Sequence, residues 1–474
     1  MEARDLAFVV SACAGELVSG SRAAVVRRVC TDSRQIQAGD LFFAIKGERF
    51  DGHDFLEDVA KKSAVAMVVS RHAEKVWSPA FRRLIGPTES GTPNRTSSAV
   101  ILVDDARRAF GQLAAAYRSE FTLPVVAVGG SNGKTTTKEL IAAVLREQFP
   151  TLWSEASFNN DIGVPATLLR LEKSHRAAVL EVGTNHPGEL APLVAMIQPQ
   201  FGVITSIGRE HLEFFGDIKG VAEEEGWLAE LLPQNGKLFL NGDTSSAEQI
   251  AHRCRGAVVR IGFGDQNDWR IGNLRTDERG VNFSVTAPRA TLSGEYRVNL
   301  LGRHQATNVT LAIAIGAELG LSQDEIRRGL ASCQPPKMRL QVFESNGVQI
   351  LNDAYNANAD SMLAALQTLN DFPCRGRRIA VLGDMAELGG HSAEAHSEVG
   401  RRTAELGVSQ LVTVGKMAGL TAQAARDAGM LDVTECNDVT EATAVLKLLA
   451  REGDVILVKA SRVTGLERLS ESLT

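Results

Sequence analysis

Residues Val125–Thr137 (VVAVGGSNGKTTT) lead from an apolar run through a glycine-rich turn into a helical pattern. This order constrains the fold strongly, because a buried strand that turns directly into a helix is how a chain builds a phosphate-binding loop. Gly130 and Gly133 let backbone N–H groups approach phosphate oxygens. Lys134 supplies a positive charge for the terminal phosphates, and Thr135 offers a hydroxyl to Mg²⁺. The stretch therefore predicts a nucleoside triphosphate site.

The spacing of this loop departs from the usual P-loop. That motif would place a glycine at position 128, where this chain has Val128, so Gly130 and Gly133 are expected to make the turn. We expect Ser131, Asn132 and Thr136 of the same loop to contact the nucleotide as well. The alternative is a glycine-rich turn that carries a Lys-Thr pair by chance.

Composition narrows the class of protein. A length of 474 residues predicts about three domains, and a mean hydropathy of −0.06 with 23% charged residues is typical of a soluble globular chain. We find no apolar run of membrane-spanning length and no signal-peptide pattern, so we expect a cytoplasmic protein. A net charge of −6 argues against a nucleic-acid partner. The six scattered cysteines indicate buried thiols rather than a zinc site or a disulfide framework.

The chain alternates apolar runs with helical patterns, which predicts an α/β fold of three domains. We expect a helix over residues 104–120, a β-rich stretch over 258–298, a linker at Pro335–Pro336 and an exposed loop over 86–98. The predicted domains are residues 1–104, a central ATP-binding domain over 105–333 with a mostly parallel, P-loop ATPase-like sheet, and a Rossmann-like α/β domain over 334–474. Besides the apolar run that begins at Val125, the expected strands are residues 64–69, 99–103, 177–182, 201–205, 237–240, 379–382, 410–414 and 455–458.

Polar side chains follow two of the expected strands. Glu181 ends the run 177–182, within a segment (EVGTNHPGE) that also carries an amide and an imidazole, and His211 follows the run 201–205. Open α/β sheets place their ligands at this carboxyl edge. Glu181 is thus a candidate magnesium ligand, although an ordinary strand-end residue is the alternative.

These residues resemble a known family, the Mur ligases of peptidoglycan synthesis, and the resemblance runs nearly end to end. Within the family, the stretches are most similar to the members that join D-alanyl-D-alanine to UDP-N-acetylmuramoyl-tripeptide. An Asp-Asn-Pro-Arg motif, typical of the ligase that adds the third stem residue, is absent. The matching stretches are TDSRQIQAGDLFFAIKGERFDGHDF (31–55), FNNDIGVPATLL (158–169), EVGTNHPGEL (181–190), GRHQATN (302–308), NDAYNANADSM (352–362), VLGDMAELGGHSAEAH (381–396) and VKASR (458–462).

The resemblance implies an ATP- and Mg²⁺-dependent amide-bond ligase that acts through an acyl phosphate. Its partners would be the two small-molecule substrates, UDP-N-acetylmuramoyl-tripeptide and D-alanyl-D-alanine, and we expect a monomer with no nucleic-acid partner and no membrane span. It implies catalytic roles for Lys134, Glu181, His211 and Asn159, with Thr135, Glu181 and His211 at the metal. The further nucleotide contacts implied by the resemblance are His304, Asn308, Arg339, Asp353, Tyr355 and Asn356. The implied substrate contacts are Ser33, Arg34, Gly47, Asp51, His53, Asn160, Asn358, Lys459, Ser461 and Arg462.

Several of these assignments have simpler alternatives. The segment at residues 31–34 could be only a solvated turn, and the basic loop at 459–462 could lie on a solvated face. His396 lies five residues after His391, which fits no metal-ligand spacing on a helix, so we interpret it as a polar packing or substrate-edge residue.

The sequence also departs from the family. A lysine that the family commonly carbamoylates corresponds here to Glu225, and we hypothesise that this glutamate supplies negative charge to the metal site, directly or through a water. Milder departures are Gln305 for asparagine, Met338 and Ala460 for glycine, and Ala359 for proline.

Two alternative functions stay open at this point. A folate-polyglutamate type ligase would share the loop and the reaction type, and a nucleotide-binding scaffold that has lost turnover would share the loop alone. The third stem residue, meso-diaminopimelate or lysine, is also open, because pocket shape rather than a motif decides it.

Overall fold

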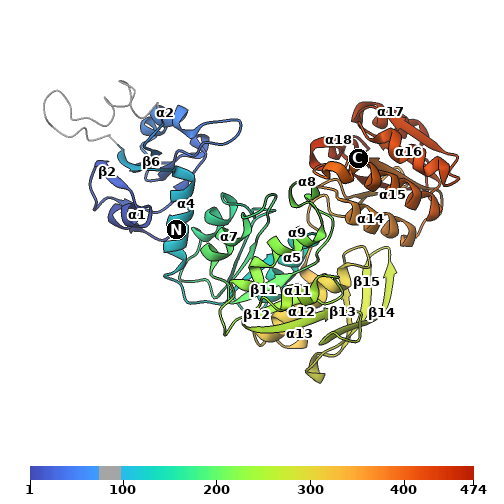
Figure 1. The fold of residues 1–474 in the computed structure, drawn as a ribbon, viewed down its shortest axis with the longest axis horizontal. Helices are drawn as coiled ribbons and strands as arrows, with labels where there is room; N and C mark the ends of the chain where they lie inside the picture. Colours follow the sequence, from blue (N-terminus) through green and yellow to red (C-terminus); the bar gives the residue numbers. More distant parts are fainter. Residues whose placement is uncertain (74–97, 474) are drawn as a thin grey trace. The chain divides into compact units, whose positions relative to one another are not determined.

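The apolar runs of the sequence become buried strands in a computed structural model, which describes residues 1–73 and 98–473 (Figure 1). By their internal contacts the residues form two units. The first comprises residues 1–125, 150–182 and 192–198, and the second comprises residues 126–149, 183–191 and 199–474. The domain boundaries expected near 104/105 and 333/334 stay predictions. Apart from Ser98, the expected loop at 86–98 lies outside the described residues.

The first unit contains a five-stranded sheet in the order β2-β7-β6-β5-β4. Strands β4 to β7 run parallel, and β2 pairs antiparallel with β7. The sheet strands are β2 (Glu16–Ser19), β4 (Val29–Cys30), β5 (Leu41–Phe43), β6 (Ala66–Ser70) and β7 (Ala99–Val103). The other elements of residues 1–125 are β1 (Arg4–Asp5), β3 (Val25–Val26), α1 (Leu6–Ala12), η1 (Ser33–Gln35), η2 (Gly52–Phe55), α2 (Leu56–Lys61) and α4 (Ala106–Arg118).

Residues 150–182 of the first unit carry the strand that ends in Glu181. Strands β9 (Thr151–Trp153) and β10 (Ala177–Glu181) pair in parallel, and α6 (Gly163–Leu168) lies between them in the chain. All five residues of β10 are buried, as expected for a strand covered on both faces. Helix α7 (Leu190–Ile197) follows.

The second unit contains strands in the order β16-β15-β14-β13-β12-β11-β8. The pairs β8–β11, β11–β12, β12–β13 and β13–β14 are parallel, whereas the pairs β14–β15 and β15–β16 are antiparallel. These strands confirm the β-rich stretch expected over 258–298. The strands are β8 (Val125–Gly129), β11 (Phe201–Ile204), β12 (Lys237–Asn241), β13 (Ala257–Gly262), β14 (Trp269–Asp277), β15 (Gly280–Thr286) and β16 (Gly294–Val298). The helices are α5 (Lys134–Leu145), α8 (Leu212–Phe215), α9 (Ile218–Glu225), α10 (Trp227–Glu230), α11 (Ala247–Ala251), η4 (Ala290–Leu292), α12 (Gln305–Glu318) and α13 (Gln323–Ser332).

The C-terminal part of this unit is a doubly wound α/β sheet in the order β17-β18-β22-β19-β20-β21. Alternate strand residues form two cores: Leu351, Ala380 and Leu457 pack in one, and Ile350, Ile379 and Ile456 pack in the other. Period-two alternation therefore buries both faces. The strands are β17 (Gln341–Ser345), β18 (Val348–Asn352), β19 (Arg378–Gly383), β20 (Gln410–Val414), β21 (Val433–Cys436) and β22 (Val455–Lys459). The helices are α14 (Ala359–Asp371), η5 (Gly389–His391), α15 (Ser392–Glu405), α16 (Ala418–Asp427), α17 (Val439–Leu449), η6 (Arg462–Thr464) and α18 (Glu467–Leu473).

Helix lengths, the cysteines and His396 can also be compared with the sequence predictions. Within residues 1–73 and 98–473, no helix has the length and apolar character needed to cross a membrane. All six cysteines are free, and the expectation of buried thiols holds for four of them but is wrong for Cys254 and Cys374, which are partly exposed. His396 is buried and accepts a hydrogen bond from the Met385 N–H (3.0 Å), which confirms its packing role.

Candidate active site

The phosphate loop joins β8 to α5, and its glycines are required by the backbone. Gly130 (φ +109°) and Gly133 (φ +89°) adopt left-handed conformations that favour glycine. A Cβ at Gly130 would lie 2.6 Å from Thr205 Oγ1, and one at Gly133 would lie 2.7 Å from Asn308 Oδ1. Because Gly133 caps α5, the helix begins at Lys134, four residues before the helical pattern that the sequence predicts over Lys138–Phe149.

Neighbouring segments hold the backbone of the loop. The Ser131 N–H donates to Ser206 O (2.8 Å), and the Asn132 N–H donates to Ser206 Oγ (3.0 Å). Thr205 Oγ1 donates to Asn132 O (2.7 Å). The loop is therefore held in place by the turn that follows β11.

Lys134 lies among oxygen atoms of its own unit. Its ammonium donates to the carbonyls of Gly130 and Ser131 and lies 3.3 Å from Glu210 Oε2. The side chains of Lys134 and Glu210 are 14% and 7% exposed, so solvent screens this ion pair little. Glu210 was not among the residues predicted from the sequence, and its position next to His211 was the only available signal.

Glu225 ends α9 and is fully buried. Its Oε2 accepts a hydrogen bond from the Gly130 N–H (2.7 Å), whereas Oε1 has no hydrogen-bond partner in the structure. Burial raises the pKa of Glu225 to about 8, and the nearby Lys134 charge opposes that rise. The residue proposed to act at the metal thus also contacts the phosphate loop.

Glu181 lies in the first unit at the end of β10, where it is 1% exposed. Asn159 Nδ2 donates to Glu181 Oε1 (2.9 Å), while Glu181 Oε2 is buried without a hydrogen-bond partner. The structure thus brings two predicted catalytic residues together. The neighbouring Asn160 accepts from the Gly163 N–H (2.8 Å) and orders the turn before α6.

The residues fit a magnesium ion by donor chemistry. Mg²⁺ prefers oxygen ligands and is usually held by one or two carboxylates, waters and substrate phosphates. Glu181 and Glu225 each leave one buried carboxylate oxygen without a partner, which is costly unless a cation or water satisfies it. Each residue, considered within its own unit, is therefore suited to face a cation.

His211 has a backbone φ of +48°, and its Nδ1 lies 2.5 Å from Glu387 Oε2. The hydrogen bond from His211 lowers the pKa of Glu387. A carboxylate on one ring nitrogen fixes the orientation of the imidazole and leaves the other nitrogen for a ligand. Sequence reasoning did not assign Glu387, although it lies in the matched stretch at 381–396.

Residues from the C-terminal sheet also meet the loop within this unit. Asn358 Nδ2 donates to Asn132 Oδ1 (3.0 Å), and Arg339 Nη2 donates to Thr135 Oγ1 (3.0 Å). The Arg339 guanidinium also stacks over the Tyr355 ring, 4.2 Å from its centroid. Residues predicted to contact the nucleotide or the substrate therefore meet the phosphate loop and the first turn of α5.

The predicted basic motif after β22 is divided between core and surface. Lys459 is buried and donates to Asp353 Oδ2 (2.6 Å) and to Asn356 O (3.0 Å). Ser461 is buried too and donates to Ala357 O (3.0 Å), whereas Arg462 is exposed. The alternative of a solvated basic loop is thus wrong for Lys459 and Ser461.

Two other predicted groups lie at the start of α12 and at the turn of residues 31–34, and the first includes Asn308, which packs against Gly133 of the phosphate loop. At the start of α12, His304 Nε2 lies 3.1 Å from Gln305 Nε2, and Asn308 Nδ2 donates to Gln305 Oε1 (3.0 Å). In the first unit, Asp32 accepts from both the N–H and the guanidinium of Arg34, between Thr31 and the short η1 helix that begins at Ser33.

A second predicted turn of the first unit surrounds His53. His53 Nδ1 lies 2.6 Å from Asp51 Oδ1, and its Nε2 accepts from the Ser70 N–H (3.0 Å). The Gly47 N–H donates to Phe50 O (2.9 Å), which closes the loop before this turn.

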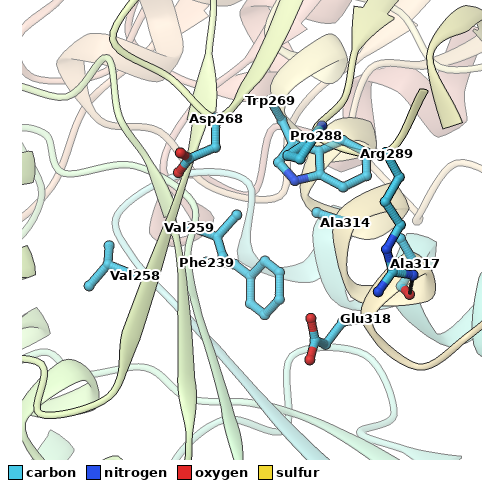
Figure 2. Close-up of a pocket in the computed structure, with 10 residues that line it drawn as sticks. All are labelled: Phe239, Val258, Val259, Asp268, Trp269, Pro288, Arg289, Ala314, Ala317 and Glu318. Atoms are coloured by element: carbon cyan, nitrogen blue, oxygen red, sulfur yellow. Dashed lines mark hydrogen bonds between the residues drawn. The ribbon is translucent and has the colours of Figure 1, made fainter.

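The cavity in Figure 2, about 280 Å³ in volume, lies elsewhere in the second unit. Phe239 and Trp269 contribute aromatic walls, and Glu318 lines it at the last residue of α12. Glu318 is ten residues along α12 from Asn308, or about 15 Å. The cavity contains no residue predicted for the site.

Comparisons with known proteins agree with this geometry. Residues 25–118 match the model described as Mur ligase family, catalytic domain, residues 128–316 match the Mur ligase middle domain, and residues 338–462 match the Mur ligase, glutamate ligase domain. The chain is 35% identical over 469 residues to the UDP-N-acetylmuramoyl-tripeptide--D-alanyl-D-alanine ligase of Bacillus subtilis (strain 168), covering 97% of this chain and 96% of that relative.

The chain belongs to the Mur ligase family. This Mur ligase is also 36% identical to the enzyme of the same name from Escherichia coli (strain K12), over 94% of this chain and 93% of that relative. Among solved structures, MurF from Acinetobacter baumannii matches with a TM-score of 0.87 at 30% identity, covering 100% and 99% of the two chains. MurF from Thermotoga maritima in complex with ADP matches with a TM-score of 0.79 at 26% identity, covering 94% of this chain and 97% of that one. The expected family and the three-domain α/β fold class are therefore confirmed.

The milder departures of this Mur ligase have physical consequences. Met338 takes the place of a common glycine at φ +58°, a conformation that costs a side chain more than it costs glycine. Ala359 is the first residue of α14, where a proline would be favourable. The Cβ of Ala460 lies 2.6 Å from where a Cβ at Gly383 would be, so Gly383 allows β19 and β22 to accept this larger residue.

Proposed function

We propose that this chain is an ATP-dependent ligase that adds D-alanyl-D-alanine to UDP-N-acetylmuramoyl-tripeptide, giving the pentapeptide, ADP and phosphate in peptidoglycan synthesis. The observation that carries the proposal is that this chain aligns over nearly its full length with two relatives that are named for this activity, at 35% and 36% identity. The phosphate loop supports it independently, because the reaction must begin by activating a carboxylate with the γ-phosphoryl group of ATP.

In this reaction the tripeptide carboxylate attacks the γ-phosphorus of ATP, the bond from that phosphorus to the β,γ-bridging oxygen breaks, ADP leaves, and an acyl phosphate forms. The amine of D-alanyl-D-alanine then attacks the carbonyl carbon, and the tetrahedral intermediate loses phosphate to leave the amide. Phosphoryl transfer needs positioning and charge stabilisation more than covalent help from the protein. Bound Mg²⁺ supplies positive charge for the transferring phosphoryl group.

Different residues bind the phosphates, stabilise charge and hold the metal. Gly130 to Thr136 hold the phosphates, with Lys134 stabilising the charge that develops on them. As the family resemblance implies, Thr135, Glu181 and His211 would hold magnesium, and Glu225 would contribute its partnerless oxygen without the carbamate that a lysine would require. Asn159 orients Glu181 through the hydrogen bond at 2.9 Å.

The remaining predicted residues bind the ends of the substrates. Residues 1–104 hold the uridine nucleotide through Ser33, Arg34, Gly47, Asp51 and His53. Residues 105–333 hold ATP, with Asn160 near the reacting carboxylate. Residues 334–474 bind D-alanyl-D-alanine and complete the nucleotide site. The C-terminal contacts are Arg339, Asp353, Tyr355, Asn356, Asn358, Lys459, Ser461 and Arg462, beside His304 and Asn308 of α12.

We also propose that the enzyme is a cytoplasmic monomer. ATP and UDP-linked substrates are cytoplasmic metabolites, and the protein surface carries a net charge of −6 that favours solubility. Analytical ultracentrifugation of the purified chain tests the monomer, and fractionation of cells that carry it tests the compartment.

The function is tested by phosphate release with ATP and Mg²⁺, supplying tripeptide and D-alanyl-D-alanine together and then each alone. Parallel assays use meso-diaminopimelate and lysine tripeptides. Release that requires both substrates, with a pentapeptide product by mass, is the expected result. Nucleotide binding without release on either tripeptide would overturn the proposal in favour of a nucleotide-binding scaffold.

A further inference from the structure

Lys134 of the phosphate loop is paired with a buried carboxylate of the protein. The ammonium donates to two carbonyls of its own loop and pairs with Glu210 at 3.3 Å. Glu210 is itself 5% exposed, and it lies on the segment between β11 and α8. The ammonium that is predicted to bind the terminal phosphates is therefore already paired with a carboxylate of the protein.

A second carboxylate acts on the same loop. Glu225 accepts the Gly130 N–H at 2.7 Å and lies close enough to feel the charges of Lys134 and Glu210. Glu210 thus pairs with Lys134 directly, and Glu225 adds negative charge near the loop as it ionises. In a low-dielectric site this balance disfavours the approach of a further anion unless a cation accompanies it.

We propose that Glu210 is a positioning residue that holds Lys134 in the nucleotide-free loop and must give up this ion pair when nucleotide phosphates bind. The inference rests on the proposed nucleotide site and assigns it a specificity. Because the bare nucleotide would meet the Glu210 carboxylate as a like charge, the site selects the magnesium complex over the metal-free nucleotide.

The exchange follows from the geometry. When a phosphate oxygen replaces Glu210 as the partner of Lys134, the Glu210 carboxylate loses its counter-ion while remaining buried, which is unfavourable. Magnesium beside the phosphates offsets that cost through its own positive charge. Without magnesium, the cost reduces the affinity for nucleotide.

The test measures ADP binding to the full-length protein by isothermal titration calorimetry, once with excess EDTA and once with saturating Mg²⁺. For Glu210→Gln we expect metal-free ADP to bind about tenfold more tightly than to the natural protein, the scale of one charge-assisted hydrogen bond. Affinity for magnesium-bound ADP should change about threefold or less. An unchanged ratio between the two conditions would overturn the proposal.

Two controls separate this role from general effects of removing a charge. Glu318→Gln removes the carboxylate of another lysine pair in the same unit, Lys237–Glu318 at 2.6 Å, on the cavity of Figure 2. This variant should bind ADP like the natural protein in both conditions. In a Lys134→Met background, Glu210→Gln should no longer tighten metal-free binding, and a persisting gain would refute the Lys134 pairing.

Folding and function are checked separately. Glu210→Asp retains the charge and should keep the magnesium dependence within about threefold of the natural protein, even if thermal unfolding shows that Glu210→Gln is destabilised. ADP binding needs neither peptide substrate. A protein that binds ADP as expected but releases no phosphate would therefore contradict the proposed ligase while leaving this inference intact.

Discussion

Two regions of the chain are predicted to hold phosphates, and they are built in opposite ways. At the phosphate loop, the Lys134 side chain is 14% exposed and is held by oxygens of the loop and by Glu210. At the turn in residues 31–34, the Arg34 side chain is 87% exposed, and among residues 1–73 and 98–473 its one ion-pair partner is Asp32 of the same turn. The first site is ordered by distant segments, whereas the second is a local turn that water can reach.

The carboxylates of the two regions also differ, because their pKa values are shifted in opposite directions. Burial raises the pKa of Glu225 to about 8 at the loop. The side-chain hydrogen bond from Arg34 lowers the pKa of Asp32 well below its usual range. Removing one partner of a buried ion pair costs much free energy, whereas an exposed ion pair contributes little to stability. We therefore expect substitutions at the loop to have much larger effects than substitutions at the turn.

The largest effect should come from Lys134→Ala. Removing one preorganised stabiliser of transition-state charge lowers kcat by about a hundredfold or more. Steady-state phosphate release at saturating substrates measures it. Lys237→Ala, at a lysine that pairs with Glu318 in the same unit, is the matched control and should retain kcat within about threefold. Near-normal turnover in Lys134→Ala would show that the loop lysine does not carry the charge stabilisation.

Glu225→Gln should have the next largest effect. Loss of one carboxylate at a metal site lowers metal affinity by roughly ten- to a hundredfold, so the Mg²⁺ concentration for half-maximal turnover should rise by that factor. Added bicarbonate should leave the natural enzyme unchanged, because a glutamate cannot be carbamoylated. A strong response of the natural enzyme to bicarbonate would contradict this role of Glu225.

Arg34→Ala tests the exposed region and should have a smaller effect. Because Arg34 is solvated and lies in the predicted uridine-nucleotide site, its loss should raise KM for the UDP-linked substrate about three- to tenfold and leave kcat unchanged. Initial rates over a range of that substrate measure both constants. A fall in kcat comparable to that of Lys134→Ala would remove the contrast between the two regions.

The smallest effect concerns stability and pH in protein free of nucleotide and metal. Glu225 has a pKa raised from 4.5 to about 8 in the folded state, so its contribution to stability is complete below pH 4.5 and is lost as pH rises through 8. Glu225→Gln should therefore raise Tm at pH 8.5 by a few degrees relative to the natural protein, since about 1 kcal/mol shifts Tm by roughly 2–4 °C in a domain of this size. Thermal unfolding in EDTA from pH 5 to 8.5 measures it.

Asp32→Asn is the comparison for that experiment. The lowered pKa of Asp32 means that its contribution is present above its unfolded value of 3.8 and is lost only as pH falls below it. The variant should therefore keep the pH profile of the natural protein between pH 5 and 8.5. A changed slope in this window would show that the turn is coupled to the rest of the fold.

Much of the fold could be predicted because its signals are local. The strands expected at residues 99–103 and 410–414 agree with the structure to the residue, since each is a mostly apolar run bounded by polar or glycine residues. Helix starts were less certain. The start of α5 at Lys134 depends on the left-handed Gly133, a backbone state that the sequence permits but does not require.

The sequence by itself determined the phosphate loop, the family and the candidates Glu181, His211 and Glu225, because these depend on residue types at short spacings. Only the tertiary structure decided their partners. Glu210 meets Lys134 across 76 residues, and Glu225 meets the Gly130 N–H across 95. Parallel strands and their crossover helices bring such residues to one sheet edge. Burial at that edge, which no local sequence pattern encodes, strengthens the interactions between their charges and shifts their pKa values.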